Sequence, residues 1–214
     1  MIVTNYYLIG NFTLSSSWIA IIVAFAVAYS LVRMLFNAQS ANRFADQFFI
    51  VLIIWKLSVV VTDAPLILQA PMSVIYFNGG LFGFCLGIIY VFVKLWMNIR
   101  RGNVTKEQLD SMMYGVILMQ AFYQVGMASL NDGPLYARLA TIVIFLALLL
   151  LTVWRIRKKT AVSNQEPLLF AAAHLFAASF QPAGYWNGAL LITLLIVGFW
   201  MLVDYLTEKG IRRK

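Results

Sequence analysis

The stretch YFNGGLFGFCLG, residues 76–87, opens an apolar segment that runs on to Trp96. Three of its glycines, Gly79, Gly83 and Gly87, recur every four residues. Small residues at this spacing let a second helix backbone approach closely inside a membrane. Asn78 stands directly before them, where a helix N-cap or a polar site residue would lie. The stretch therefore predicts a tightly packed transmembrane helix with a polar group at its start.

The composition places the whole chain in a membrane. Of its 214 residues, 62% are hydrophobic and 11% are charged, and the mean hydropathy is +0.84. Soluble domains are about half apolar and about a quarter charged. The net charge of +8 fits a bias of Lys and Arg toward the loops on one side of a membrane better than it fits a nucleic-acid partner. We therefore expect one all-α polytopic membrane domain that covers residues 1–214.

Seven apolar segments are candidate membrane spans, because a full crossing takes about 20 mostly apolar residues. They are residues 18–36, 48–61, 79–96, 109–127, 135–154, 167–180 and 188–205. The second and the sixth are short and contain polar residues, so they fit this criterion least well.

The basic residues of the loops predict the orientation. Fourteen of the 16 Lys and Arg residues lie at the end of the first, third, fifth or seventh span or after it: Arg33, Arg43, Lys94, Arg100, Arg101, Lys106, Arg155, Arg157, Lys158, Lys159, Lys209, Arg212, Arg213 and Lys214. Cytoplasmic loops carry the excess of Lys and Arg. With an odd number of spans, the C-terminus is then cytoplasmic and the N-terminus lies outside.

Polar side chains inside the spans are the first candidates for function, because they are costly in lipid. A central lysine costs about 2.5–3.5 kcal/mol on insertion scales, so Lys56 needs a partner, water or an anionic lipid head group. Gln120 and Gln124 share one face of the fourth span, which Tyr123 borders. Hydrogen bonding between helices is the alternative reading of these glutamines.

The sixth span has a polar face of its own. His174 and Gln181 lie seven residues apart and therefore on the same side of a helix. A hydrogen-bonded interior histidine is the alternative to a catalytic base at His174. With one His and one Cys in the chain, we expect no metal site, and no motif for a cofactor is recognised.

Taken in order, these motifs resemble the prolipoprotein diacylglyceryl transferase family of bacterial inner-membrane enzymes over nearly the whole chain. Residues 8–14 (LIGNFTL) are similar to the hydrophobic segment before the family's first span. Residues 73–83 (SVIYFNGGLFG) resemble its S-x-H-G-G-L-x-G motif, and residues 121–127 (AFYQVGM) stand in place of its R-x-G-N signature. Leu135-Tyr136 matches its L-Y-E motif, and residues 167–170 (PLLF) match the start of its sixth span.

The resemblance implies seven spans, an outside N-terminus and a bacterial plasma membrane. The family transfers a diacylglyceryl group from phosphatidylglycerol to a lipoprotein precursor, using arginines for the phosphate and a histidine proposed as the base. The chain departs from it where that chemistry resides: Asn78 replaces the histidine, Gln124 the arginine of R-x-G-N and Met127 its asparagine, Ala137 the glutamate of L-Y-E, and Gln181 lies near the sixth-span arginine. The residues kept are Gly79, Gly80, Gly83, Gly126 and Tyr136.

Asn cannot abstract a thiol proton, and Gln has no charge to offer a phosphate. We therefore expect a transferase-like protein, degenerate at the catalytic positions, that binds a phospholipid or a lipidated segment in an intramembrane cavity. The candidate head-group residues are Lys56, Asn78, Gln124, Arg138 and Gln181.

Two alternatives stay open. One is an active transferase with a rebuilt site, whose catalytic candidates are Asn78, Tyr123 and His174. The other is an accessory subunit of another membrane protein, in which the glycine stripe packs against a partner helix. The glycines expected at helix contacts are Gly79, Gly80, Gly83, Gly87 and Gly126.

Overall fold

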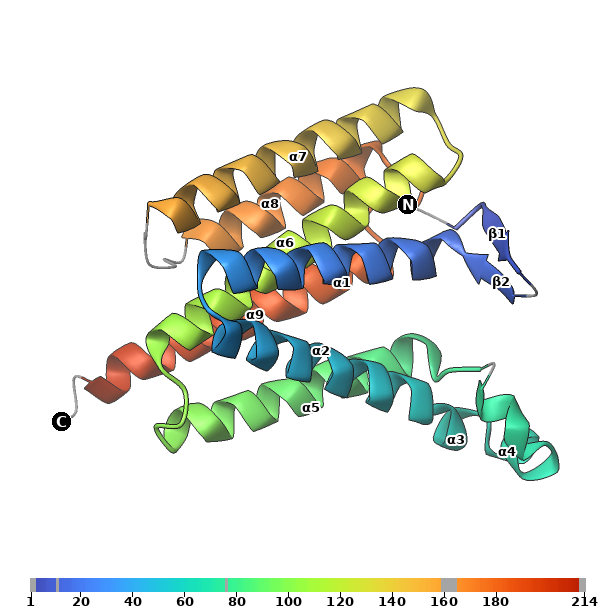
Figure 1. Ribbon diagram of the computed structural model, residues 1–214, viewed down its shortest axis with the longest axis horizontal. Coiled ribbons are helices and arrows are strands. Elements are labelled where there is room, and N and C mark those ends of the chain that lie inside the picture. The colour runs from blue at the N-terminus through green and yellow to red at the C-terminus, as the bar shows by residue number, and fades with distance from the viewer. Residues whose placement is uncertain (1–2, 11, 76, 159–164, 212–214) are drawn as a thin grey trace. The chain divides into compact units, whose positions relative to one another are not determined.

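Long helices make up most of the computed structural model, which describes residues 3–10, 12–75, 77–158 and 165–211. In chain order the elements are β1 (Tyr6–Ile9), β2 (Phe12–Ser15), α1 (Ser16–Leu35), α2 (Ala38–Leu57), α3 (Val59–Thr62), α4 (Ala64–Gln69), η1 (Pro71–Ile75), α5 (Gly80–Arg100), α6 (Lys106–Leu130), α7 (Leu135–Arg157), α8 (Gln165–Phe180) and α9 (Gly188–Ile211) (Figure 1). Each predicted span coincides with one of the long helices or overlaps it. The predicted class, a helical multi-pass membrane protein, is confirmed.

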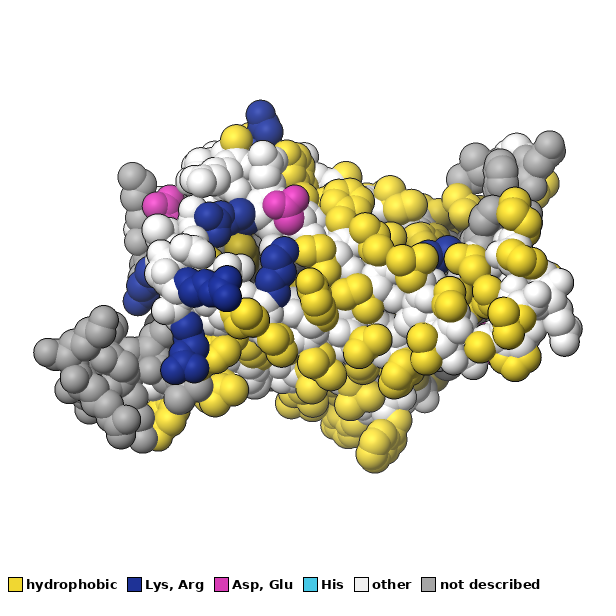
Figure 2. Space-filling model, turned by 90° about the horizontal axis from the view of Figure 1, so that it is seen from below, with side chains coloured by type: hydrophobic (Ala, Val, Ile, Leu, Met, Phe, Trp, Pro, Cys, Tyr) yellow, Lys and Arg dark blue, Asp and Glu magenta, His cyan; other side chains and the backbone are white. Residues whose placement is uncertain are grey.

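Five helical stretches among the described residues are long and apolar enough to cross a membrane: Ser16–Leu35, Ala38–Thr62, Gly80–Arg100, Leu135–Arg157 and Gly188–Tyr205. Figure 2 shows hydrophobic side chains covering broad stretches of the surface, as lipid contact requires. The other two predicted spans also form helices. However, α6 carries charged residues in its first turns and two glutamines further on, and α8 has only 16 residues.

The helices of the chain gather in two compact units. The first comprises residues 1–41 and 107–214, and the second comprises residues 42–106. In the first unit α8 packs against both α7 and α9. The most enclosed helix there is α6, with 12 buried residues. Its polar side chains are therefore shielded by the surrounding helices, which explains how a polar helix fits among apolar ones.

Helix α1 lies along α6 through a stripe of small residues. Its buried residues recur every fourth position: Ser16, Ala20, Ala24, Ala28 and Val32. A Cβ added at Gly126 of α6 would lie 3.2 Å from the Cβ of Ala20, so the two backbones approach closely. The Ser16 hydroxyl donates to Asn131 Oδ1 at 2.7 Å, and the Asn37 amide donates to Glu107 Oε1 at 3.4 Å. These contacts join both ends of the helices, which run antiparallel.

The N-terminal strands form an antiparallel hairpin that the sequence analysis did not predict. Its register pairs Tyr6 with Ser15 and Ile9 with Phe12. Gly10 lies in the turn with φ +60°, a conformation that glycine adopts without steric cost. Each strand has four residues, too few for a periodic pattern to be recognised.

In the second unit the glycine stripe packs α5 against α2 of the same chain. A Cβ added at Gly79 or Gly83 would overlap the Ser58 side chain, and one at Gly87 would lie 3.0 Å from the Val51 carbonyl oxygen. Gly80 differs, since a Cβ there would meet nothing within 4 Å and its φ is +56°. Glycine is therefore favoured at this position by the backbone conformation and not by a close helix contact.

The second predicted span, residues 48–61, begins too late and includes the point where one helix ends and another begins. Helix α2 starts ten residues earlier, at Ala38, and ends at Leu57 before the short α3. The Asn37 side chain accepts from the Ser40 backbone N–H at 2.7 Å, which caps the helix start. Polar residues in the first turns lowered the apparent hydropathy there, so the sequence showed only the apolar second half.

Candidate functional site

Three helices of the first unit meet at a buried polar cluster. Gln124 of α6, His174 of α8 and Thr193 of α9 are 1%, 0% and 0% exposed. Gln124 Nε2 lies 3.3 Å from His174 Nε2, and His174 Nδ1 lies 2.7 Å from Thr193 Oγ1. We call these residues the Gln–His–Thr cluster. It joins two residues that the sequence analysis placed on separate helix faces and adds a third that it did not name.

The hydrogen bonds assign the proton of the imidazole. The Thr193 hydroxyl donates to the Ala189 carbonyl at 3.1 Å, so its oxygen accepts from His174 Nδ1–H. His174 Nε2 is then the acceptor for the Gln124 amide N–H. Both ring nitrogens of a neutral histidine are thereby occupied. Gln124 Oε1 is buried and has no hydrogen-bond partner among the described residues.

Aromatic rings enclose the histidine. The Phe145 ring centroid lies 5.3 Å away in an edge-on arrangement, and that of Phe170 lies 6.5 Å away. A general base has to come within hydrogen-bond reach of its substrate. In this structure His174 touches only core groups, so its arrangement serves to cross-link three helices. Tyr123, the other catalytic candidate in this unit, lies partly buried in α6 beside Gln124 in sequence.

The remaining polar candidates of the first unit also bond to the protein itself. Gln181 Nε2 donates to Thr141 Oγ1 at 3.1 Å, and Gln120 Nε2 approaches the Ala189 carbonyl at 3.5 Å. Arg138 Nε donates to the Ala128 carbonyl at 2.9 Å, near the end of α6. A cation at a helix C-terminus stabilises the last carbonyls and the helix dipole. Arg138 therefore caps α6 from the start of α7.

The second unit holds the other two candidates, Lys56 and Asn78. Lys56 lies in the last turn of α2 and is partly exposed. The Asn78 side chain accepts from the Gly80 backbone N–H at 3.0 Å, just before α5. Their neighbours are joined directly, because Gly79 N–H donates to the Trp55 carbonyl at 3.0 Å. The structure thus brings the end of α2, which carries Lys56, to the start of α5, which carries Asn78.

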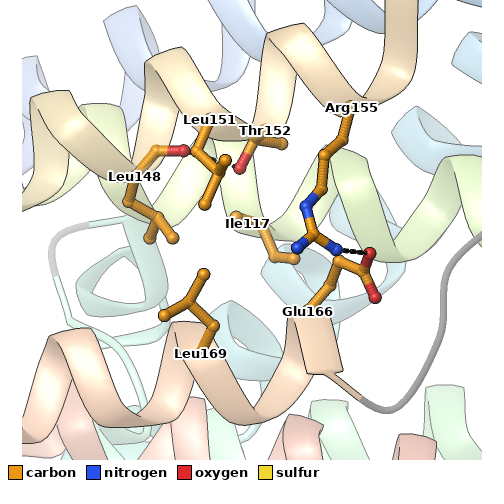
Figure 3. Close-up of a pocket in the computed structure, with 7 residues that line it drawn as sticks. All are labelled: Ile117, Leu148, Leu151, Thr152, Arg155, Glu166 and Leu169. Atoms are coloured by element: carbon orange, nitrogen blue, oxygen red, sulfur yellow. Dashed lines mark hydrogen bonds and ion pairs between the residues drawn. The ribbon is translucent and has the colours of Figure 1, made fainter. Parts of the chain in front are cut away.

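A small pocket of the first unit opens beside an ion pair at the junction of α7 and α8. Arg155 of α7 binds Glu166 of α8, whose side chain is 7% exposed. Figure 3 shows the pair at one end of an apolar pocket lined by Ile117, Leu148, Leu151, Thr152 and Leu169. The centre of a water molecule can reach about 10 Å³ of this space, roughly the room for one water molecule. The pocket is too small for a lipid head group.

Asn131 is a second buried polar residue, besides Thr193, that the sequence did not point to. It is 1% exposed, and its Oδ1 accepts from Thr4 N at 2.8 Å, Asn5 N at 3.3 Å and Ser16 Oγ at 2.7 Å. The sequence Asn-Asp-Gly-Pro, residues 131–134, is typical of a turn. Its side-chain amide instead holds the N-terminal segment at the end of α6 by hydrogen bonds. No local sequence pattern predicts partners so distant along the chain.

Comparison with family models, with curated proteins and with solved structures gave no match. The resemblance to the diacylglyceryl transferases therefore stays a prediction that rests on the motifs quoted above. Among the described residues, no group of three or more His, Cys, Asp or Glu side chains could hold a metal ion.

Proposed function

We propose that this chain is a seven-span, transferase-like protein of a bacterial plasma membrane that binds an anionic phospholipid and does not transfer its diacylglyceryl group. The observation that carries the proposal is the Gln–His–Thr cluster. Gln124 stands where the family's arginine is expected, and its amide points to His174 in a core that is closed to solvent. A residue in that setting stabilises the helix bundle and does not hold a phosphate.

The contacts within the first unit support a crossing by α6 and by α8. Helix α6 is joined to both ends of α1, which is a candidate span. Helix α8 is joined to α7, another candidate span, near the end of α7 through Glu166–Arg155 and in its first half through Gln181–Thr141. A helix that reaches both ends of a spanning neighbour traverses the same layer. These contacts support seven crossings, and the charge bias of the loops supports a cytoplasmic location for the basic ones.

The junction of α2 and α5 supports lipid binding. Lys56 lies within the candidate span Ala38–Thr62 and is partly exposed, so an anionic lipid group can approach its charge. Asn78 lies at the same junction and offers an amide for hydrogen bonding. A phosphate of phosphatidylglycerol can bind a cation and an amide carried by the same junction, and the apolar helix surface accommodates its acyl chains.

Native mass spectrometry of the purified protein with phosphatidylglycerol and with phosphatidylcholine tests the lipid binding. We expect retention of phosphatidylglycerol, and a several-fold loss of retention in Lys56→Gln. The matched control is Lys158→Gln, which removes a cation that lies over the Trp154 ring at 4.2 Å and leaves the junction intact. Equal retention of both lipids, or equal loss in both variants, would overturn the proposal.

The absence of transferase activity has its own test. The gene is expressed in a strain from which the diacylglyceryl transferase has been depleted, and lipidation of a lipobox substrate is followed by its shift in gel mobility. We expect a protein that inserts in the membrane yet leaves the substrate unmodified. Lipidation that is lost in His174→Gln and kept in Lys158→Gln would instead establish an active enzyme with a rebuilt site.

A further inference from the structure

The chain between α2 and α5 exposes several large apolar side chains. We call residues 59–75, which comprise α3, α4 and η1, the α3–η1 segment. Helix α4 has no buried residue. The exposed fractions are 74% for Val61, 83% for Leu68 and 70% for Met72. A contiguous exposed apolar patch on a protein marks a site that contacts lipid or another protein.

The ends of the segment locate it at a membrane boundary. Its first helix, α3, forms the end of the candidate span Ala38–Thr62, and the rest of the segment leads toward the candidate span Gly80–Arg100. The hydrogen bond from Gly79 N–H to the Trp55 carbonyl, 3.0 Å long, holds those two ends together. Figure 1 shows α3 and α4 following the end of α2 before the chain turns back to α5. The segment therefore starts and finishes where two apolar helices leave the bilayer.

The composition of the segment indicates what covers it. Asp63 is its single charged residue, and it contains no Lys or Arg. Helices bound to anionic membrane surfaces by charge carry Lys and Arg on their polar face, so an electrostatic anchor is ruled out. Burial of apolar side chains is the remaining source of affinity, because it removes apolar surface from water.

We propose that the α3–η1 segment lies in the interfacial layer of the bilayer, with Leu68 and Met72 inserted at the boundary of the acyl chains. The occupant of this apolar face is membrane lipid, irrespective of head-group charge. This proposal does not depend on the phosphatidylglycerol site at Lys56. The segment anchors the end of the α2–α5 pair in the layer where phospholipid head groups lie.

Spin labels on single cysteines test the depth of the segment. Cys85 is the only cysteine of the chain, so Cys85→Ala provides the background for Leu68→Cys and Met72→Cys in phosphatidylcholine nanodiscs. Power saturation then compares collisions with oxygen, which concentrates in hydrocarbon, and with a water-soluble nickel chelate. We expect an oxygen-to-nickel ratio several-fold higher at both positions than at Gln69→Cys, the exposed polar neighbour. The ratios should not change in phosphatidylglycerol nanodiscs.

Two results would overturn the proposal. Nickel collisions at Leu68→Cys and Met72→Cys as frequent as at Gln69→Cys would place the segment in water. Few collisions with either reagent would mean that protein covers it, from a second copy or a partner.

A second measurement uses no label and keeps Cys85. The double variant Leu68→Asp/Met72→Asp should lower the thermal unfolding midpoint in nanodiscs while leaving the midpoint in detergent close to that of the control Gln69→Asp. An equal midpoint for both variants in nanodiscs would contradict insertion.

Discussion

At the scale of single residues, Asn131 stabilises the fold because several donors share its one side-chain carbonyl oxygen. Replacement by Ala leaves the buried Ser16 hydroxyl and the backbone N–H of Thr4 without their acceptor. An unsatisfied buried group costs about 1–3 kcal/mol. We expect Asn131→Ala to lower the free energy of unfolding in detergent by at least that amount.

The same variant should release the N-terminal segment before the bundle unfolds. Amide hydrogen exchange should become faster for residues 4–8 than for α6. The control is Asp132→Ala, because the Asp132 side chain is exposed and its bond to Thr4 uses the backbone N–H. Unchanged exchange in Asn131→Ala would show that the hairpin alone holds this segment.

The Gln–His–Thr cluster permits a direct measurement of one interhelical hydrogen bond. We expect Gln124→Leu and His174→Phe each to destabilise the protein, because each leaves a buried partner unpaired. The double variant should be less damaging than the sum, with a coupling of about 0.6–1.7 kcal/mol, the range found between membrane helices. A double-mutant cycle on thermal or denaturant unfolding supplies this number.

A matched cycle without contact provides the control for that coupling. Gln124→Leu combined with Ser30→Ala joins two positions whose hydrogen bonds are separate, since Ser30 donates to the Ala26 carbonyl within α1. This pair should be additive. A coupling of the same size in both cycles would contradict the specific contact.

At the scale of elements, the close packing of α5 on α2 depends on Gly79 and Gly83, which leave room for the Ser58 side chain. A Cβ at Gly83 would lie 2.9 Å from Ser58 Cβ and would overlap its hydroxyl. We expect Gly83→Ala to destabilise the protein by about 1–3 kcal/mol, the usual cost of overpacking. Thermal unfolding in detergent measures the effect, and Ser58→Gly should restore part of the loss.

Gly198→Ala is the control for this pair. A Cβ at Gly198 of α9 would meet nothing within 4 Å, and Ala is favoured over Gly inside a helix by about 1 kcal/mol. It should therefore be neutral or stabilising. If Gly83→Ala behaved like Gly198→Ala, the glycine stripe would not pack inside the monomer, and a partner helix would become the better account.

At the scale of the whole molecule, the sequence located the long helices but not the contacts between them. Runs of apolar residues identify α1, α5, α7 and α9, because each keeps its apolar character along its whole length. The early start of α2 was missed since its first turns are polar. The partners of Asn131 and His174 lie in distant segments, and their selection depends on tertiary packing that no local pattern records.

Whether α6 crosses the membrane also depends on contacts that the sequence does not show. Its hydropathy alone does not predict a crossing, whereas its contacts with α1 favour one. If α6 crosses, Asn103 before it and Gly133 after it lie on opposite sides of the membrane; otherwise both lie on the same side. Both residues are exposed. In a Cys85→Ala background, we expect a membrane-impermeant maleimide to label Gly133→Cys in intact spheroplasts, and Asn103→Cys only after permeabilisation.

Helix α8 gives an independent second pair, Lys158→Cys and Tyr185→Cys, at exposed positions before and after it. With seven crossings, Tyr185→Cys is labelled from outside and Lys158→Cys from the cytoplasm. With only the five apolar stretches crossing, α7 would reverse its direction and carry its basic end outside, against the charge bias of the loops. Labelling of Lys158→Cys in intact spheroplasts would therefore contradict both the seven-span arrangement and the orientation that the basic residues predict.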